Sequence, residues 1–105
     1  MRFVAHDLSL ELVHLLREPL AQLRRHDAAL ARQAIAAVSS VALNLAESRG
    51  RVGRDRLHLV RVALGSLREV GAALDVAVAW GWLPAAPAAA ERDRLAGMLY
   101  ALQRG

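Results

Sequence analysis

Cysteine is absent from this chain of 105 residues. Its absence excludes disulfide frameworks, thiolate metal sites and thiol nucleophiles, and it makes a reducing cytoplasm the compartment that we expect. The first residues, MRFVAHDLSLEL, contain no uninterrupted apolar stretch of signal-peptide length before Asp7. A chain of this length can bury enough surface to fold as one domain, so we expect a single domain over residues 1–105.

Lysine is also absent, so all 14 basic residues are arginines. Arginine binds phosphate through two parallel hydrogen bonds, which lysine cannot do. The formal net charge of +4 is confined to one segment, because residues 49–61 contain five arginines and only one acidic residue, Asp55, while charges balance elsewhere. The sequence therefore places its excess positive charge in one short stretch.

Proline and glycine are few, and apolar residues recur at helical spacing in the first half of the chain. Asp7 is expected to cap a first helix, which Pro19 kinks or restarts. Asp27 is expected to cap the start of a second helix, which begins at about Ala28. This helix is expected to end at about Ser48, because the turn residue Gly50 follows Ser48.

A third helix is expected from near Arg54 to Trp80 or Gly81, where Gly81 and Pro84 stop it. Pro87 suits the first turn of a short fourth helix. Four helices joined by short connections predict an all-α fold, an antiparallel up-down-up-down four-helix bundle.

The third helix has more apolar positions than one core can cover, which predicts that part of it packs on another subunit. A membrane span is the alternative, but the apolar stretch at residues 70–83 is shorter than the ~20 residues required and contains Asp75. We therefore expect a homo-oligomer and no membrane. The apolar positions are Leu57, Leu59, Val60, Val62, Leu64, Leu67, Val70, Leu74, Val76 and Val78.

On the second helix, polar and small residues form one stripe beside the apolar one, at i, i+4, i+7, i+11 and i+14. Polar groups among aliphatic side chains must be hydrogen-bonded, so these residues predict a structural polar network that joins the second and third helices. Glu47 is expected to pair with Arg51 or Arg68. The predicted network consists of Gln33, Ser40, Asn44, Glu47, Arg51, Ser66 and Glu69.

Other readings of the acidic residues are weaker. Glu47 and Glu69 could form an acid/base pair, but no His or Lys completes such a site. Glu11 and His14 have the Glu-x-x-His spacing of di-iron bundles, but those sites need a second such pair and two further glutamates. We therefore predict no metal, no cofactor and no catalytic residue.

Residues 30–83 resemble a family of four-helix-bundle proteins. The family includes proteins encoded in intervening sequences of bacterial large-subunit ribosomal RNA genes and the accessory variability determinant of diversity-generating retroelements. Ser48 stands where the family usually has Gly. The matching residues are Gln33, Ala37, Ser40, Asn44, Ala46, Glu47, Gly50 and Arg51, followed by Ala63, Gly65, Ser66 and Glu69.

The resemblance implies a ring-like homo-oligomer of four-helix bundles, with a pentamer favoured, and no enzymatic activity. It also implies a basic surface for RNA or DNA and a role as accessory factor to a reverse transcriptase or another protein partner. With the local charge, it predicts phosphate contacts by Arg49, Arg54, Arg56 and Arg61.

One alternative is that the arginine segment is only a solvated basic turn with no partner. Two other functions also stay open. The first is a protein-binding adaptor without nucleic-acid affinity, whose arginines meet an acidic protein surface. The second is a small helical enzyme of the chorismate-mutase type, which also grips carboxylates with arginines. That enzyme relies on a lysine, and this chain has none.

Overall fold

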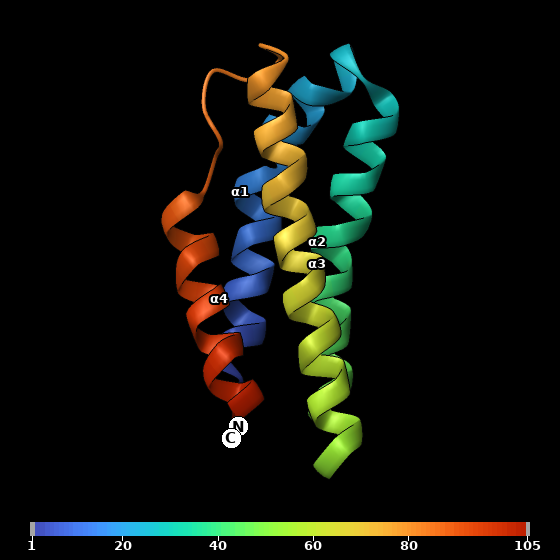
Figure 1. The fold of residues 1–105 in the computed structure, drawn as a ribbon, viewed down its shortest axis with the longest axis vertical. Helices are drawn as coiled ribbons and strands as arrows, with labels where there is room; N and C mark the ends of the chain where they lie inside the picture. Colours follow the sequence, from blue (N-terminus) through green and yellow to red (C-terminus); the bar gives the residue numbers. More distant parts are fainter. Residues whose placement is uncertain (1, 105) are drawn as a thin grey trace.

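The computed structural model describes residues 2–104, which form four α-helices and, within that range, no strand. Helix α1 spans Val4–His26, α2 spans Ala28–Ser48, α3 spans Gly53–Ala79 and α4 spans Ala89–Arg104. The helices run alternately up and down around a common core, with both chain ends at the same end of the bundle as the α2–α3 turn (Figure 1). The all-α class and the four-helix arrangement predicted from the sequence are confirmed.

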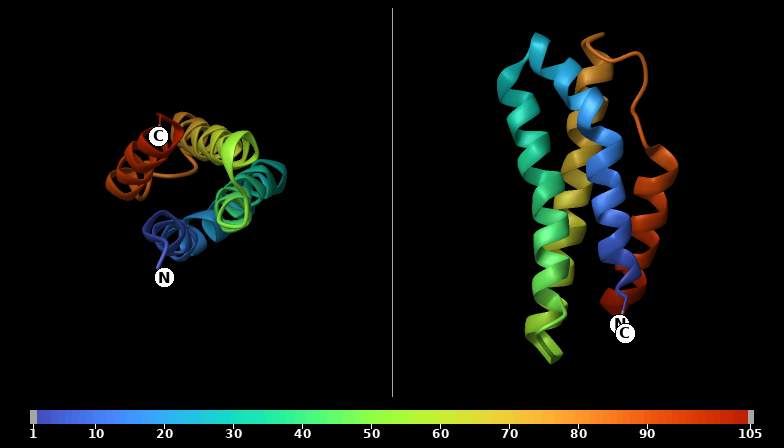
Figure 2. Two further views of the ribbon diagram at one scale, coloured as in Figure 1. Left: turned by 90° about the horizontal axis from the view of Figure 1, so that it is seen from below. Right: turned by 180° about the vertical axis from the view of Figure 1, so that it is seen from behind.

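Consecutive helices are neighbours, so that α1, α2, α3 and α4 follow one another around the core (Figure 2). The α2–α3 contact is the most extensive, and the α1–α4 contact is the smallest of the four neighbouring pairs. The core is filled almost entirely by leucine, valine and alanine, with Leu12, Leu16, Leu45, Leu74 and Leu99 fully buried. All four helices contribute residues to this one hydrophobic core.

The boundary between α1 and α2 matches the prediction. Asp27 is the only residue between the two helices, and its side chain accepts a hydrogen bond of 3.0 Å from the backbone N–H of Leu30. Its own backbone N–H donates to the carbonyl of Leu23. One residue thus caps the start of α2 and satisfies the end of α1.

Two details of the predicted helix boundaries were wrong, at Asp7 and at Pro87. Asp7 does not cap α1: the helix begins at Val4, and Asp7 lies in its first turn, where it forms an ion pair with Arg2. Pro19 lies inside α1, which continues to His26, so the helix does not restart there. Pro87 precedes α4 by two residues instead of forming its first turn.

The end of α3 is closed by glycine. Gly81 has a φ of +80°, a conformation that residues with a Cβ rarely adopt. Its N–H donates to the carbonyl of Val78, and the N–H of Trp82 donates to that of Ala77. These two bonds form a Schellman motif, which turns the chain back toward α4.

Helix α2 is the one described helix whose length and mean hydropathy, 21 residues at 1.3, are those of a membrane span. Buried core helices of soluble proteins pass the same test. Here Val38, Val41 and Leu45 of α2 lie in the hydrophobic core. The membrane alternative raised from the sequence concerned α3, and α3 does not meet these criteria of length and hydropathy.

Candidate nucleic-acid interface

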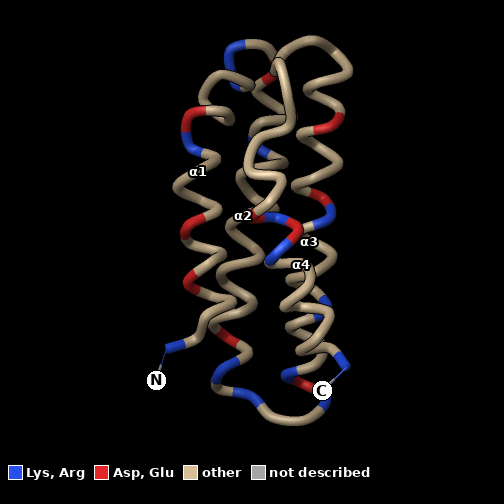
Figure 3. The backbone as a smooth tube through the Cα atoms, turned by 90° about the vertical axis from the view of Figure 1, so that its left-hand side faces the viewer, with Lys and Arg blue, Asp and Glu red and all other residues tan. Residues whose placement is uncertain are grey.

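The arginine-rich segment forms the α2–α3 turn and the first turns of α3. Residues 49–52 connect Ser48 to Gly53, whose φ of +61° redirects the chain into α3. Because the bundle has four antiparallel helices, this turn lies at the same end as both chain ends, and Figure 3 shows the blue arginine segments gathered there. We call this set of residues the basic end: Arg2, Arg49, Arg51, Arg54, Arg56 and Arg104.

Two of these arginines have carboxylate partners. Arg51 donates to Glu47 at 3.0 Å and lies 3.7 Å from a carboxylate oxygen of Asp55. Arg2 is paired with Asp7 at 2.6 Å. Both pairs are at least partly exposed to solvent, so they hold side chains in place more than they stabilise the fold. The pairing of Glu47 with Arg51, which the sequence predicted, is present.

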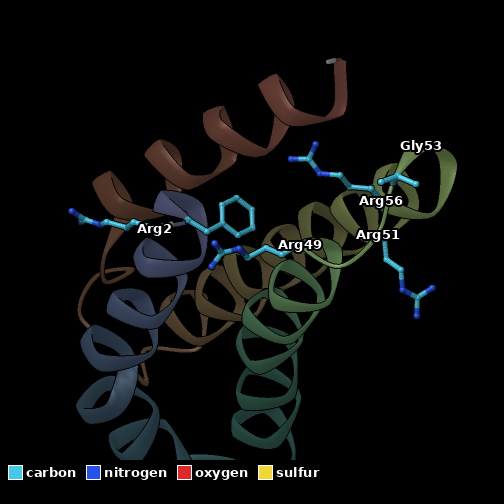
Figure 4. Close-up of a pocket in the computed structure, with 7 residues that line it drawn as sticks. Arg2, Arg49, Arg51, Gly53 and Arg56 are labelled. Carbon is cyan, nitrogen blue, oxygen red and sulfur yellow. The ribbon is translucent and has the colours of Figure 1, made fainter.

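Arg49 is the predicted contact with the most constrained side chain. Its guanidinium carbon lies 5.6 Å from the centre of the Phe3 ring, which is a cation–π contact between the α2–α3 turn and the start of α1. Figure 4 shows Arg49 directed toward the start of α1. Arg49 thus connects two parts of the basic end.

Arg54, Arg56 and Arg104 form no ion pair with any residue in the range 2–104. They line one hollow of about 390 Å³ between the start of α3 and the end of α4. Leu57 and Val60 also line this hollow. It is the part of the basic end where positive charge is least compensated by described neighbours.

The guanidinium groups do not converge on one point. In Figure 4, Arg56 extends toward α4, Arg49 toward α1, and Arg2 and Arg51 outward on different sides. The hollow that these residues line together with Phe3, Val52 and Gly53 measures about 360 Å³. Divergent positive groups suit an extended polyanion better than a single small anion.

Arg61 differs from the other predicted contacts. It is exposed on α3, eight residues beyond Gly53. At a rise of 1.5 Å per residue this places it about 12 Å from the start of the helix. Arg61 therefore lies on the flank of the bundle and not at its end.

The sequence did not identify Arg2 and Arg104 as part of this site. The charges of residues 1–27 and of the residues beyond 61 each sum to zero, so neither arginine contributes to the local charge excess. The predicted up-down-up-down topology could have identified them, because in a bundle of four antiparallel helices both chain ends lie at the same end as the α2–α3 turn.

Part of the predicted polar network is present between α2 and α3. The hydroxyl groups of Ser40 and Ser66 are 2.9 Å apart, and the side-chain amide of Asn44 donates to the Ser40 carbonyl and hydroxyl at 2.8 and 3.0 Å. Glu47 and Arg51 form their pair farther toward the solvent. Gln33 and Glu69 are exposed, and neither forms a hydrogen bond or ion pair within the described part of the chain.

Other residues considered from the sequence have simple roles. Arg68 does not reach Glu47: it donates to the hydroxyl of Tyr100, with its guanidinium 5.3 Å from that ring. Glu11 and His14 are both exposed on α1. Among residues 2–104 no group of three or more His, Asp or Glu side chains is close enough to hold a metal ion.

The opposite end of the bundle is aromatic. Trp82 stacks with His26 at a ring distance of 6.1 Å and with Trp80 at 5.5 Å. Trp82 is packed against the core, whereas Trp80 is 68% exposed. Trp82 is therefore the tryptophan that anchors this end of the bundle to the core.

No family model, no curated protein and no solved structure matches this chain.

Proposed function

We propose that this protein is a non-enzymatic scaffold that binds RNA or DNA through its basic end and acts as a ring-like homo-oligomer. The observation that carries the proposal is the hollow between α3 and α4, where Arg54, Arg56 and Arg104 have no carboxylate partner among the described residues. Repetition of such a surface around a ring adds weak phosphate contacts together. The resemblance noted above supports a pentamer and a role as accessory factor to a reverse transcriptase.

The geometry favours a polyanion over a small carboxylate substrate. An enzyme of the chorismate-mutase type requires arginines that converge on one ligand, and the arginines of the basic end diverge (Figure 4). The chain also lacks the lysine on which such enzymes rely. The other alternative, an adaptor for acidic proteins, would use the same arginines. The nucleic-acid binding experiment below distinguishes it from the proposed function.

The test is binding of RNA and DNA of mixed sequence to the purified protein at several salt concentrations. Binding should be largely independent of sequence, and its logarithm should fall by roughly 0.9 per decade of salt for each duplex phosphate contacted. The variant Arg54→Ala/Arg56→Ala should lower this slope by up to about 2. The control Arg68→Ala/Arg94→Ala removes the same charge from α3 and α4 at positions outside the basic end, and it should leave the slope nearly unchanged.

Two results would contradict the proposal. Failure of the unmodified protein to shift any RNA or DNA at low salt would exclude nucleic-acid binding and leave the adaptor. Equal loss of affinity in both double variants would show that only net charge acts, not the basic end.

A further inference from the structure

Helix α2 has an unusual surface for a helix at the outside of a monomer. Arg32 and Glu47 are its only charged residues, and only 39% of its most apolar 18-residue window is buried. Leu43, at the centre of the outward face, is 69% exposed. An apolar, exposed face of this kind marks an interaction surface. The outward positions are Ala28, Arg32, Ala36, Ser39, Leu43 and Ala46.

A groove lies on one side of this face, between α1 and α2. Its volume is about 720 Å³, and its apolar lining includes Val13 and Leu20 of α1 and Ile35 and Val38 of α2. Its charged lining is mainly basic, with three arginines and one glutamate: Arg17, Arg24, Arg25 and Glu18. Charge complementarity therefore favours an apolar occupant that carries an acidic group.

An apolar surface with an acidic group lies on the other side of α2, where α2 and α3 meet. Val62, Glu69 and Val76 are spaced by seven residues, which places them on one face of α3, and all three are exposed. Leu43 lies at the height of Val62, because Ser40 contacts Ser66 and the helices are antiparallel. This α2/α3 face has the composition that the α1/α2 groove requires.

The charged groups of the two surfaces lie at the same height along the bundle. Arg17 precedes Asp27 by ten residues and Ala37 follows it by ten, so these two positions are level in the antiparallel pair α1 and α2. Ala37 precedes Ser40 by three residues and Glu69 follows Ser66 by three, so these are also level. A neighbouring copy rotated about an axis parallel to the bundle would therefore bring its Glu69 to Arg17.

The two surfaces are adjacent sides of the bundle and share α2. The angle between the outward directions of the two surfaces sets the number of copies in the ring: about 90° closes a ring of about four, and about 108° a ring of about five. Surfaces on opposite sides of the bundle would give an open filament. In a closed ring of this kind the shared helix lies nearest the axis. This position would cover Leu43 and the small residues on the outward face of α2, and it would place Arg32, the one charged residue of that face, near the axis.

We propose that the α2/α3 face of one copy docks in the α1/α2 groove of the next, with Glu69 paired to Arg17 and α2 nearest the ring axis. This inference rests on the proposed oligomer and specifies how it assembles. Glu69, which forms no ion pair among the described residues, obtains its partner across the subunit boundary. The basic ends of all copies then lie on the same face of the ring.

The test is the mass of the assembly, measured by light scattering over a range of protein concentrations. Arg17→Glu and Glu69→Arg should each weaken association by at least about tenfold, since each places like charges opposite one another. The double variant Arg17→Glu/Glu69→Arg should restore association. Leu43→Glu should dissociate the oligomer independently of this pair.

Matched controls separate assembly from folding. Glu11→Arg makes the same charge change as Glu69→Arg at another exposed glutamate, and Leu15→Glu matches Leu43→Glu at a leucine that is 42% exposed and lies on the α4 side of α1. Both should keep the assembly, and circular dichroism should show that all variants are helical. These positions lie outside both proposed surfaces.

The outcomes distinguish this inference from the proposed function. An unmodified protein that is monomeric at micromolar concentration overturns both the ring and its interface, whatever it binds. An oligomer that persists in Arg17→Glu, Glu69→Arg and Leu43→Glu overturns the interface alone. Dissociation by both single reversals without rescue in the double variant overturns the pairing of Arg17 with Glu69.

Discussion

At one end of the bundle α1 passes into α2 through the single residue Asp27, whose side chain caps α2, and Trp82 stacks with His26 beside it. At the other end α2 passes into α3 through residues 49–52, and Val52 provides no side-chain cap for α3. The first end has a tight connection with its polar groups satisfied. The second has an exposed connection and uncompensated arginines. The aromatic end is thus held together by capping and stacking contacts, whereas the basic end exposes its connection and its arginines to solvent.

The largest effect on stability is expected at the aromatic end. Trp82→Ala removes a ring that packs on the core and stacks with both His26 and Trp80, so it should lower the free energy of unfolding by about 2 to 4 kcal/mol. Trp80→Ala is the control, because Trp80 is mostly exposed. Urea unfolding followed by circular dichroism measures both. Equal losses in the two variants would contradict the assignment of Trp82 as the anchor.

A smaller loss is expected from the connection between α1 and α2. Asp27→Ala removes the side-chain oxygen that caps α2, which should cost about 1 kcal/mol. Asp27→Asn keeps an oxygen that can accept from the Leu30 N–H, so it should keep most of that stability. Thermal unfolding of the three proteins side by side measures the difference. A large loss in the asparagine variant would assign the effect to the charge of Asp27 instead of its hydrogen bond.

The basic end can be given the cap that it lacks. Val52 is 85% exposed and has the extended backbone of an N-cap residue, with φ −132° and ψ 160°. Val52→Ser should therefore stabilise the protein by about 0.5 to 1 kcal/mol. Val52→Ala, which shortens the side chain without adding an oxygen, is the control for thermal unfolding. Nucleic-acid affinity should not change, because no arginine is removed.

The sequence predicted α2 well because its limits are local. Asp27 has the side chain that a helix start requires, and the residues that close α2 follow directly in the turn at 49–52. The start of α1 and the role of Pro87 were not predicted: α1 begins directly after Phe3, and Ala88, with a φ of +56°, separates Pro87 from α4. As its composition predicted, the third helix has apolar positions that the core does not cover: Val62 and Val76 are exposed, while Val70 is fully buried.

The candidate site was predicted in part for a similar reason. The local charge excess identified the α2–α3 turn, but Arg104 is adjacent to it only in three dimensions. Periodicity placed Gln33 and Glu69 on the polar stripes, but it did not show that they face outward. The spacing of polar residues along one helix does not show which of them are close enough to the neighbouring helix to form hydrogen bonds with it. Ser40, Asn44 and Ser66 lie within that reach, and Gln33 and Glu69 do not.

The smallest effect on stability is expected from Glu47→Ala. The sequence alone placed Glu47 in a structural network, where its loss would cost about 1 to 3 kcal/mol. In the structure the side chains of Glu47 and Arg51 are each about half exposed, 53% and 47%, and an exposed pair one helical turn apart contributes about 0.5 kcal/mol or less. Thermal unfolding should therefore hardly change.

The same variant should strengthen binding at the basic end. Without Glu47, Arg51 retains only the longer contact to Asp55, so its guanidinium is more available to phosphate. If Arg51 then contacts a duplex phosphate, the salt slope should rise by up to about 0.9. Glu11→Ala, which removes the same charge from an exposed position on α1, is the control and should leave the slope unchanged. A loss of stability above about 1 kcal/mol with no change in binding would assign Glu47 to the fold and not to the basic end, because a solvent-exposed pair cannot account for a loss of that size.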